Sequence, residues 1–314
     1  MCRGRGRLPR RPCAARHEAG RRSSDDDRTI WHATALRRHT PCMTARMLEP
    51  FDPVVVAPWR IGAGSRGALL LHGFAGTPPE LRRLGEHLAA SGWRCHAPAL
   101  PGHAATPEAL ERTTWRDWVA GAQRALDELA AECDVTVVAG QSMGATMALH
   151  LAATDLRVAA VASLAAPVRL AGFLLRLLPA LKHVARWHRP GDDVDLWNQD
   201  AVEELYSYGL RSTRAINELN RFCAHVRDEL AQVRCPVLVL HGGRDRTVDP
   251  ACADEIARRL VCSTSVERHV FPRSGHALSV DVDRERVNML VEAWFERFTA
   301  AAHAAAATAE AAAV

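Results

Sequence analysis

A single serine stands between two glycines where an apolar run gives way to a helix-like run. The segment Asp134–Ala153 reads DVTVVAGQSMGATMALHLAA, and Ser142 has Gly140 and Gly144 two residues away on either side. A tight strand-to-helix turn strains the serine backbone and leaves little room beside it, which explains the glycines. Such a turn presents the hydroxyl at the edge of a sheet, near a helix N-terminus. Ser142 is therefore predicted to be a nucleophile.

A serine hydroxyl is a poor nucleophile without a neighbouring base. Among the 15 histidines, His276 lies in PRSGHALSVD, between an expected strand at Val266–Phe271 and the last expected helix. In a doubly wound sheet, that loop opens on the same carboxyl edge as Ser142. His276 is therefore the predicted base, whereas His269 lies inside the strand and is expected to be a packed residue.

The base needs a carboxylate to orient it. The segment GRDRTVDP follows the expected strand CPVLVLHG and supplies Asp245 and Asp249. Asp245 is nearer to the end of the strand and is the predicted orienting residue. Asp249 precedes Pro250, a pattern typical of the start of a turn or helix, so we expect it to cap a helix. The alternative, in which Asp249 orients His276, is open to direct test by mutation.

An acyl-transfer site also needs two backbone N–H groups for the oxyanion. Met143 directly follows the nucleophile, and Phe74 follows the apolar run LLLHG. Both positions match the oxyanion donors of hydrolases with this serine turn. We predict that Phe74 and Met143 form the oxyanion hole, and that His72 has a structural role beside it.

The elements that would position these residues alternate between strand and helix. Short apolar runs alternate with amphipathic helices such as Pro78–Gly92, which places Leu81, Leu84 and Leu88 on one face. This pattern predicts an α/β protein with a mostly parallel, doubly wound sheet covered on both faces. A helical interlude at about residues 168–232 interrupts the alternation and is predicted to be a small cap inserted before the strand that carries the acid. Its apolar run, residues 168–178, is too short to span a membrane.

Charge is distributed unevenly along the 314 residues. The formal net charge is +4, but residues 1–46 carry 12 arginines against 4 acidic residues, so the remainder is mildly acidic. This distribution argues against a nucleic-acid-binding protein. The nine cysteines lack CxxC pairs, which argues against a disulfide framework or a zinc ribbon and favours a reducing cytoplasm.

Both ends of the chain differ from its centre in composition. Residues 1–46 have no apolar periodicity and no secretory hydrophobic region. We expect them to be a disordered extension, or an untranslated one if Met43 or Met47 is the true start. Residues 47–298 are predicted to form the main domain, and residues 299–314 an alanine-rich tail.

Several further motifs join these residues in a familiar combination. They are, in chain order, LLLHGFAGTPPELRRLGEHLAASGW, HAPALPGHAATPEAL, TTWRDWV, GQSMGA, CPVLVLHGGRDRTVDP and SGHALSVDVDRERV. From about Ala68 to Phe298, the sequence resembles the bacterial carboxylesterase and monoacylglycerol-lipase branch of the α/β-hydrolase superfamily. The resemblance implies hydrolysis of carboxylic esters through an acyl-enzyme, with a cap between the sixth and seventh core strands. The sequence shows no metal-binding constellation and no G-x-G-x-x-G after the first strand, and this mechanism needs neither, so we expect no cofactor or metal.

Carried over by position, the resemblance assigns the same roles to Ser142, Asp245 and His276, and to Phe74 and Met143. Two positions depart from the family pattern. Ala145 replaces a second glycine after the serine turn, and Ala104 replaces the last glycine of a G-H-G motif, which is expected to reshape the rim of the site slightly.

The substrate is predicted to be a small-molecule ester with a short or medium acyl chain, or a monoacylglycerol. The apolar cap residues Phe173, Leu174 and Leu177 suit an acyl chain, although packing on the core explains them equally well. Thioesterases, serine peptidases and C–C hydrolases use the same triad, and an inactive hydrolase-fold binding protein is a further alternative. We expect no nucleic-acid partner and no stable membrane insertion, and the sequence does not set the oligomeric state.

Overall fold

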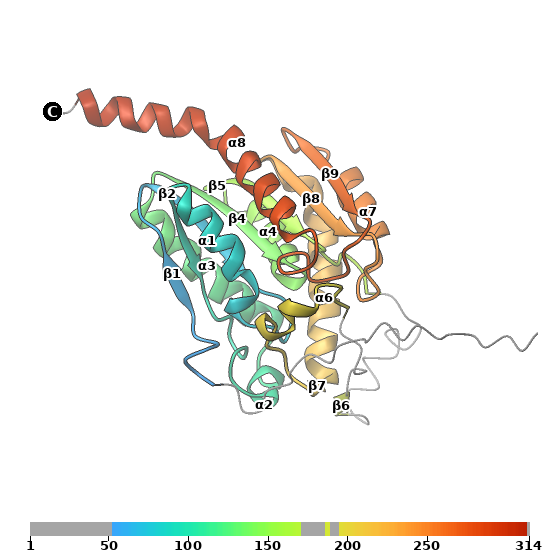
Figure 1. Cartoon of the computed structure of the whole chain (residues 1–314). Coiled ribbons are helices and arrows are strands. Elements are labelled where there is room, and N and C mark those ends of the chain that lie inside the picture. The colour runs from blue at the N-terminus through green and yellow to red at the C-terminus, as the bar shows by residue number, and fades with distance from the viewer. Residues whose placement is uncertain (1–51, 171–185, 189–194, 313–314) are drawn as a thin grey trace, which may run out of the picture. The chain divides into compact units, whose positions relative to one another are not determined.

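The computed structural model describes residues 52–170, 186–188 and 195–312. Its centre is a seven-stranded sheet with the strand order β1-β3-β2-β4-β5-β8-β9 (Figure 1). The strands are β1 Trp59–Ile61, β2 Arg66–Leu71, β3 Trp93–Ala97, β4 Val135–Gln141, β5 Val158–Leu164, β8 Val237–Gly242 and β9 Val266–Phe271. Only β1 runs antiparallel to its neighbour, β3, and the other pairs are parallel. The predicted fold class is confirmed.

Helices cover both faces of this sheet. They are η1 Pro78–Leu81, α1 Arg82–Ala90, α2 Pro107–Glu111, α3 Trp115–Glu132, α4 Met143–Thr154, α6 Thr213–Glu229, α7 Ala251–Arg259 and α8 Arg284–Ala312. The apolar residues of α1 and α8 join one core cluster, and those of α3, α4, α6 and α7 join another. Strand β2 serves both clusters, because Leu69 and Leu71 belong to one and Ala68 and Leu70 to the other.

The leucine pattern of the first predicted helix is buried as expected. Leu81, Leu84 and Leu88 are fully buried, and Gly92 adopts a φ of +84° just beyond the helix. The segment divides into the 3₁₀ turn η1 and the α-helix α1, which an apolar spacing of three and four residues does not distinguish. Strand β1 was not predicted, since three residues are too few to show a period of two.

The interlude separates β5 from β8. In chain order these are the fifth and sixth strands of the sheet, one strand earlier than the family resemblance implies. Its described part contains η3 Gln199–Glu204, the helix α6, the 3₁₀ turn η4 Leu230–Gln232 and a two-stranded sheet of β6 Trp187–His188 and β7 Arg211–Ser212. Among the described helices, none is both long enough and apolar enough to cross a bilayer.

Candidate active site

Ser142 lies in the sharp turn between β4 and α4. Its φ of +56° and ψ of −118° are strained for a residue with a side chain. A Cβ atom added to Gly140 would lie 2.2 Å from the carbonyl of Gly144, and one added to Gly144 would lie 1.9 Å from the carbonyl oxygen of Leu71. Glycine is therefore required on both sides, for the steric reason that the sequence suggested.

The loops after β8 and β9 bring Asp245 and His276 to this serine. His276 Nε2 lies 2.9 Å from Ser142 Oγ, and His276 Nδ1 lies 2.8 Å from Asp245 Oδ2. The three residues follow the carboxyl ends of three parallel strands, which is how residues so distant in sequence meet at one edge of the sheet. The arrangement has the geometry of a nucleophile, a base and an orienting acid.

The side chain of Asp245 is completely buried and has four hydrogen-bond donors. Its Oδ2 is approached by His276 Nδ1 and, at 3.0 Å, by His241 Nε2. Its Oδ1 accepts from the backbone N–H groups of Thr247 and Val248 at 2.9 and 2.8 Å. Burial opposes ionisation, but the hydrogen bonds from the two histidines outweigh it and lower the pKa of the Asp245 carboxyl well below its usual range. Asp245 is therefore held as a carboxylate.

The carboxylate of Asp245 in turn changes the pKa of His276. Burial by itself would lower the pKa of the imidazole, but the hydrogen bond to Asp245 and the negative charge of that residue raise it above its ordinary value.

Asp249 occupies a different environment. It accepts from the N–H of Ala251, the first residue of α7, at 2.9 Å and pairs with Arg169 at 2.8 Å. The N-cap of α7 is Pro250, so Asp249 lies one residue before the cap that the sequence predicted it to be.

The loop after β2 lies beside the serine and is held by a buried glutamate. The Gly73 N–H donates to Glu80 Oε2 at 2.7 Å, and a Cβ on Gly73 would lie 3.5 Å from Ser142 Cβ. Phe74 follows directly, and Met143 is the first residue of α4. Burial raises the pKa of Glu80 to about 7, although the Gly73 N–H and the positive charge of His276 oppose the shift.

His72 holds the same loop through its two ring nitrogens. Nδ1 donates to the Gly73 carbonyl at 2.9 Å, and Nε2 accepts from the Leu100 N–H at 3.1 Å. Burial lowers the pKa of His72 to about 4, so the ring is neutral near pH 7. Both nitrogens are bonded to backbone, which supports the structural role predicted for His72.

With this geometry in place, the chain can be compared with known proteins. The family model described as Hydrolase_4, serine aminopeptidase, S33, matches residues 66–283. The chain belongs to this family. A thermostable monoacylglycerol lipase from Bacillus sp. (strain H-257) is 32% identical over 243 residues, which cover 77% of this chain and 93% of that protein. A carboxylesterase from Bacillus subtilis (strain 168) is 24% identical, over 78% of this chain and 98% of its own length.

The fold is also similar to those of solved lipolytic enzymes. A structure from work on LipS and LipT, two metagenome-derived lipolytic enzymes, has a TM-score of 0.73 and 27% identity, and covers 77% of this chain and 98% of its own. A soluble variant of the monoglyceride lipase from Saccharomyces cerevisiae has a TM-score of 0.67 at 16% identity, over 77% of this chain and 91% of its own, and shows the fold alone. The resemblance inferred from the sequence motifs is confirmed.

Gln141, the residue before the serine, is hydrogen-bonded to the loop that carries His276. Gln141 is fully buried. Its Nε2 donates to the His276 carbonyl at 2.7 Å, and its Oε1 accepts from the Ser279 N–H at 3.4 Å. Gln141, the first variable position of the G-x-S-x-G motif, therefore helps to hold the backbone of the His276 loop in place. The motif alone does not reveal this role.

The middle of the interlude, at Asp195 and Trp197, is hydrogen-bonded to the loops that carry Asp245 and His276. Asp195 Oδ2 accepts from the backbone N–H groups of Arg246 and Thr247, and the Asp195 carbonyl accepts from the His276 N–H at 3.0 Å. Asp281, which follows His276 in the chain, accepts from the N–H groups of Trp197 at 2.9 Å and of Gly275 at 2.7 Å, so it joins the interlude to the His276 loop. Asp195 stands in the acidic segment GDDVDLW, and no spacing in the sequence reveals these contacts because its partners are distant in the chain.

The two departures from the family pattern are accommodated without loss of the turn geometry. Ala145 is fully buried in the first turn of α4, and Ala104 adopts a φ of +53° in the loop that follows β3. The predicted substrate residues Phe173, Leu174 and Leu177 lie outside the described residues.

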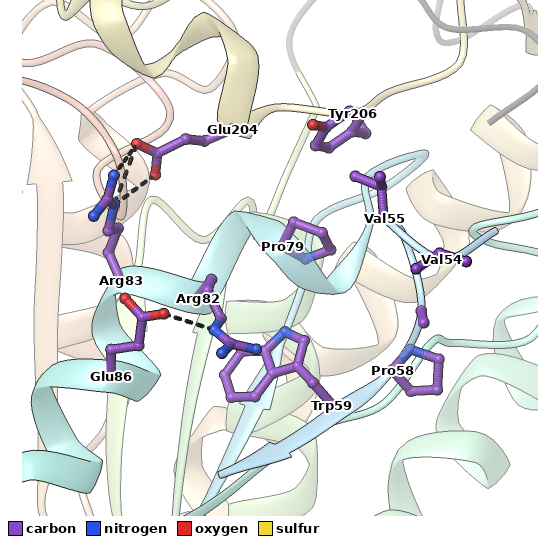
Figure 2. Close-up of a pocket in the computed structure, with 11 residues that line it drawn as sticks. Val54, Val55, Pro58, Trp59, Pro79, Arg82, Arg83, Glu86, Glu204 and Tyr206 are labelled. Atoms are coloured by element: carbon purple, nitrogen blue, oxygen red, sulfur yellow. Dashed lines mark hydrogen bonds and ion pairs between the residues drawn. The ribbon is translucent and has the colours of Figure 1, made fainter. Parts of the chain in front are cut away.

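A hollow of about 490 Å³ lies on the outer side of η1 and α1, and no triad residue lines it. Figure 2 shows its walls, where Trp59 lies beside Arg82 and where Arg83 pairs with Glu204 across the opening. The arginines are already paired with carboxylates, so this hollow offers no free cation to a ligand among its described lining residues. It is not part of the triad site.

Proposed function

We propose that this protein is a serine hydrolase that cleaves carboxylic esters through an acyl-enzyme. The observation that carries the proposal is the chain of contacts from Ser142 Oγ through His276 to Asp245, at 2.9 and 2.8 Å, on a serine whose backbone is left-handed. Membership of the Hydrolase_4 family and the lipase and esterase names of its relatives support the same chemistry.

In the proposed reaction, Ser142 Oγ attacks the acyl carbonyl carbon while its proton passes to His276 Nε2. The oxyanion that forms accepts hydrogen bonds from the backbone N–H groups of Met143 and Phe74. Collapse of this tetrahedral intermediate expels the alcohol, which takes the proton from His276. A water molecule then gives its proton to His276 Nε2 and attacks the acyl-enzyme, and the carboxylic acid leaves as Ser142 regains its proton.

Two buried groups prepare this reaction. Asp245, held as a carboxylate by four donors, fixes the Nδ1–H tautomer of His276 and stabilises the imidazolium that forms. Glu80 accepts from the Gly73 N–H at 2.7 Å. This bond fixes the peptide group directly before the one that carries the Phe74 N–H, the proposed oxyanion donor. Neither group exchanges a proton with the substrate in this scheme.

For the substrate, we propose short or medium acyl esters or monoacylglycerols. The 32% identical relative is named a monoacylglycerol lipase and the 24% identical one a carboxylesterase. We also propose that Phe173, Leu174 and Leu177 contact the acyl chain. Phe173→Asp should then impair long-chain esters more than acetates, and an equal loss across chain lengths would contradict the proposal.

The deciding experiment combines active-site labelling with a substrate panel. A fluorophosphonate probe should label the wild-type protein with one equivalent and should leave Ser142→Ala unlabelled, whereas Ser263→Ala, a serine in another loop, should label normally. Turnover of p-nitrophenyl esters and monoacylglycerols should fall in Ser142→Ala by roughly a million-fold. Preference for acyl-CoA or amide substrates would favour the thioesterase or peptidase alternative, and full labelling of Ser142→Ala would overturn the nucleophile assignment.

We further propose that residues 47–298 form the catalytic domain, with residues 168–232 as its cap, residues 299–314 as an alanine-rich tail and residues 1–46 dispensable. We propose a reducing compartment, the cytoplasm, because the six cysteines among the described residues are all free. Deletion of residues 1–46 should leave turnover and melting temperature within error of the full chain. A melting temperature lower by more than about 5 °C would show that the segment packs on the domain.

A further inference from the structure

Two histidines and a glutamate meet where α4 packs against the last turns of α6. They are His150, seven residues beyond the first residue of α4, and His225 and Glu229, four residues apart on one face of α6. No part of the proposed ester hydrolysis uses these three residues. The spacing in the sequence could not reveal them as a group, because His150 and His225 are far apart in the chain.

The carboxylate of Glu229 lies between the two imidazoles. His150 Nδ1 is 2.7 Å from Glu229 Oε2, and His225 Nε2 is 2.9 Å from Glu229 Oε1. One potential ligand atom from each residue lies within 4.8 Å of the other two. Neighbouring ligands of a tetrahedral zinc ion, bound at about 2.0–2.2 Å, are roughly 3.3 Å apart. The two histidine–glutamate contacts are therefore about half an ångström shorter than neighbouring ligands of a bound ion would be, and the whole group is compact enough to close around one.

The surroundings hold this group in place but leave one side open. The side chain of His150 is 9% exposed and that of Glu229 is 16% exposed, whereas that of His225 is 43% exposed. The ring of Phe222 lies 5.8 Å from that of His150, and the ring of Trp115 lies 4.8 Å from that of His225. Two ligands are thus fixed by burial and packing, while solvent can reach the third and fill a remaining coordination position.

We propose that His150, His225 and Glu229 bind a divalent transition-metal ion, with zinc as the best match. Two imidazoles and one carboxylate are ligands that zinc prefers, and a water completes the tetrahedron. Without metal, the contacts to Glu229 are hydrogen bonds from His150 Nδ1 and His225 Nε2, and these are the nitrogen atoms that would bind the ion.

The position of the site indicates a structural role for the ion. Ser142 precedes α4 and His150 lies about two turns further along, roughly 12 Å along the helix axis. An ion there would join the helix that begins at the nucleophile to α6, the helix that ends the interlude. It would be distinct from the triad, which contains none of its ligands.

Calorimetric titration of the EDTA-treated full chain with zinc chloride tests the proposal. The wild-type protein should bind one equivalent that His225→Ala and Glu229→Gln bind at least tenfold more weakly. His269→Ala is the matched control, because His269 Nε2 lies 2.7 Å from Glu267 in a pair that is not part of such a three-ligand group. It should bind zinc as the wild-type protein does.

Circular dichroism and melting temperatures distinguish a loss of zinc binding from a loss of folding. Because His225 is half exposed, His225→Ala should fold normally, and circular dichroism would verify this. Zinc should raise the melting temperature of the wild-type protein and of His269→Ala, but not that of His225→Ala. An absence of zinc binding, or identical isotherms for the wild-type protein and folded His225→Ala, would overturn the proposal without affecting the esterase assignment.

Discussion

Two aspartates four residues apart in the loop after β8 occupy opposite environments. The side chain of Asp245 is fully buried and receives four donors, two of them imidazoles. That of Asp249 is 40% exposed and faces Arg169 and the first turn of α7. The same residue type therefore contacts His276 at one end of the loop and the first residue of helix α7 at the other, and this difference in contacts is the basis for the different roles that we propose.

A third carboxylate shows what burial does without such a set of donors. Glu80 is as buried as Asp245, but the hydrogen bond that holds it is a single backbone N–H from Gly73 at 2.7 Å. Its pKa rises to about 7, whereas that of Asp245 falls. For these two buried carboxyls, the hydrogen bonds of the neighbouring histidines and the charge of His276 lower the pKa of Asp245, whereas burial outweighs the single N–H donor of Glu80.

The largest expected effect is that of Asp245→Asn. The amide cannot enforce the Nδ1–H tautomer of His276 or stabilise the imidazolium, so turnover of p-nitrophenyl esters should fall by roughly a thousand-fold or more. Steady-state kinetics on purified protein would measure it, with circular dichroism to verify the fold. If Asp245→Asn kept most of its turnover and Asp249→Asn lost it, the roles assigned within this loop would be reversed.

The pH dependence tests the same pair through the base. His276 must be neutral to accept the serine proton, and its pKa is raised, so kcat/KM should fall about tenfold per pH unit below a midpoint that lies above 6.5. In Asp245→Asn, the interaction that raises this pKa is absent while burial still lowers it. The midpoint should then move to lower pH, and an unchanged midpoint would show that Asp245 does not control the protonation of His276.

Glu80→Ala should have an intermediate effect. Loss of the acceptor for the Gly73 N–H frees the loop that carries the proposed donor of Phe74, so kcat should fall on the order of tenfold, less than the loss of a whole oxyanion donor. The KM should change little. Glu80→Gln retains a carbonyl acceptor and should recover most of kcat. Equal losses in the two variants, or a loss confined to KM, would contradict a positioning role.

The positions of Ser142, Asp245 and His276 could be predicted because each lies in a loop of distinctive composition directly after a predicted strand. The steric reason for Gly140 and Gly144 was equally local. Such signals depend on neighbours in the chain, which the sequence displays directly.

Residues that act through distant partners could not be predicted in this way. His241 lies at the end of an apolar strand and resembles a core residue, yet it contacts Asp245. Glu80 stands in an ordinary amphipathic pattern, and Asp195 in an acidic run. Their roles depend on tertiary contacts with Gly73 and with the loops of Arg246 and His276, which no spacing rule describes.

The smallest expected effect is that of Asp249→Asn, and it completes the comparison within the loop. Asp249 contacts Arg169 and the Ala251 N–H, and its side chain is remote from the hydrogen bonds that orient His276. Asparagine retains a side-chain oxygen that can accept from the Ala251 N–H, so the change removes chiefly a partly exposed ion pair, which contributes at most about 1 kcal/mol. The melting temperature should fall by no more than roughly 2–4 °C, and turnover by at most a few-fold. Differential scanning calorimetry and ester kinetics would measure both. A rate loss as large as that of Asp245→Asn would mean that Asp249, despite its exposure, controls the base.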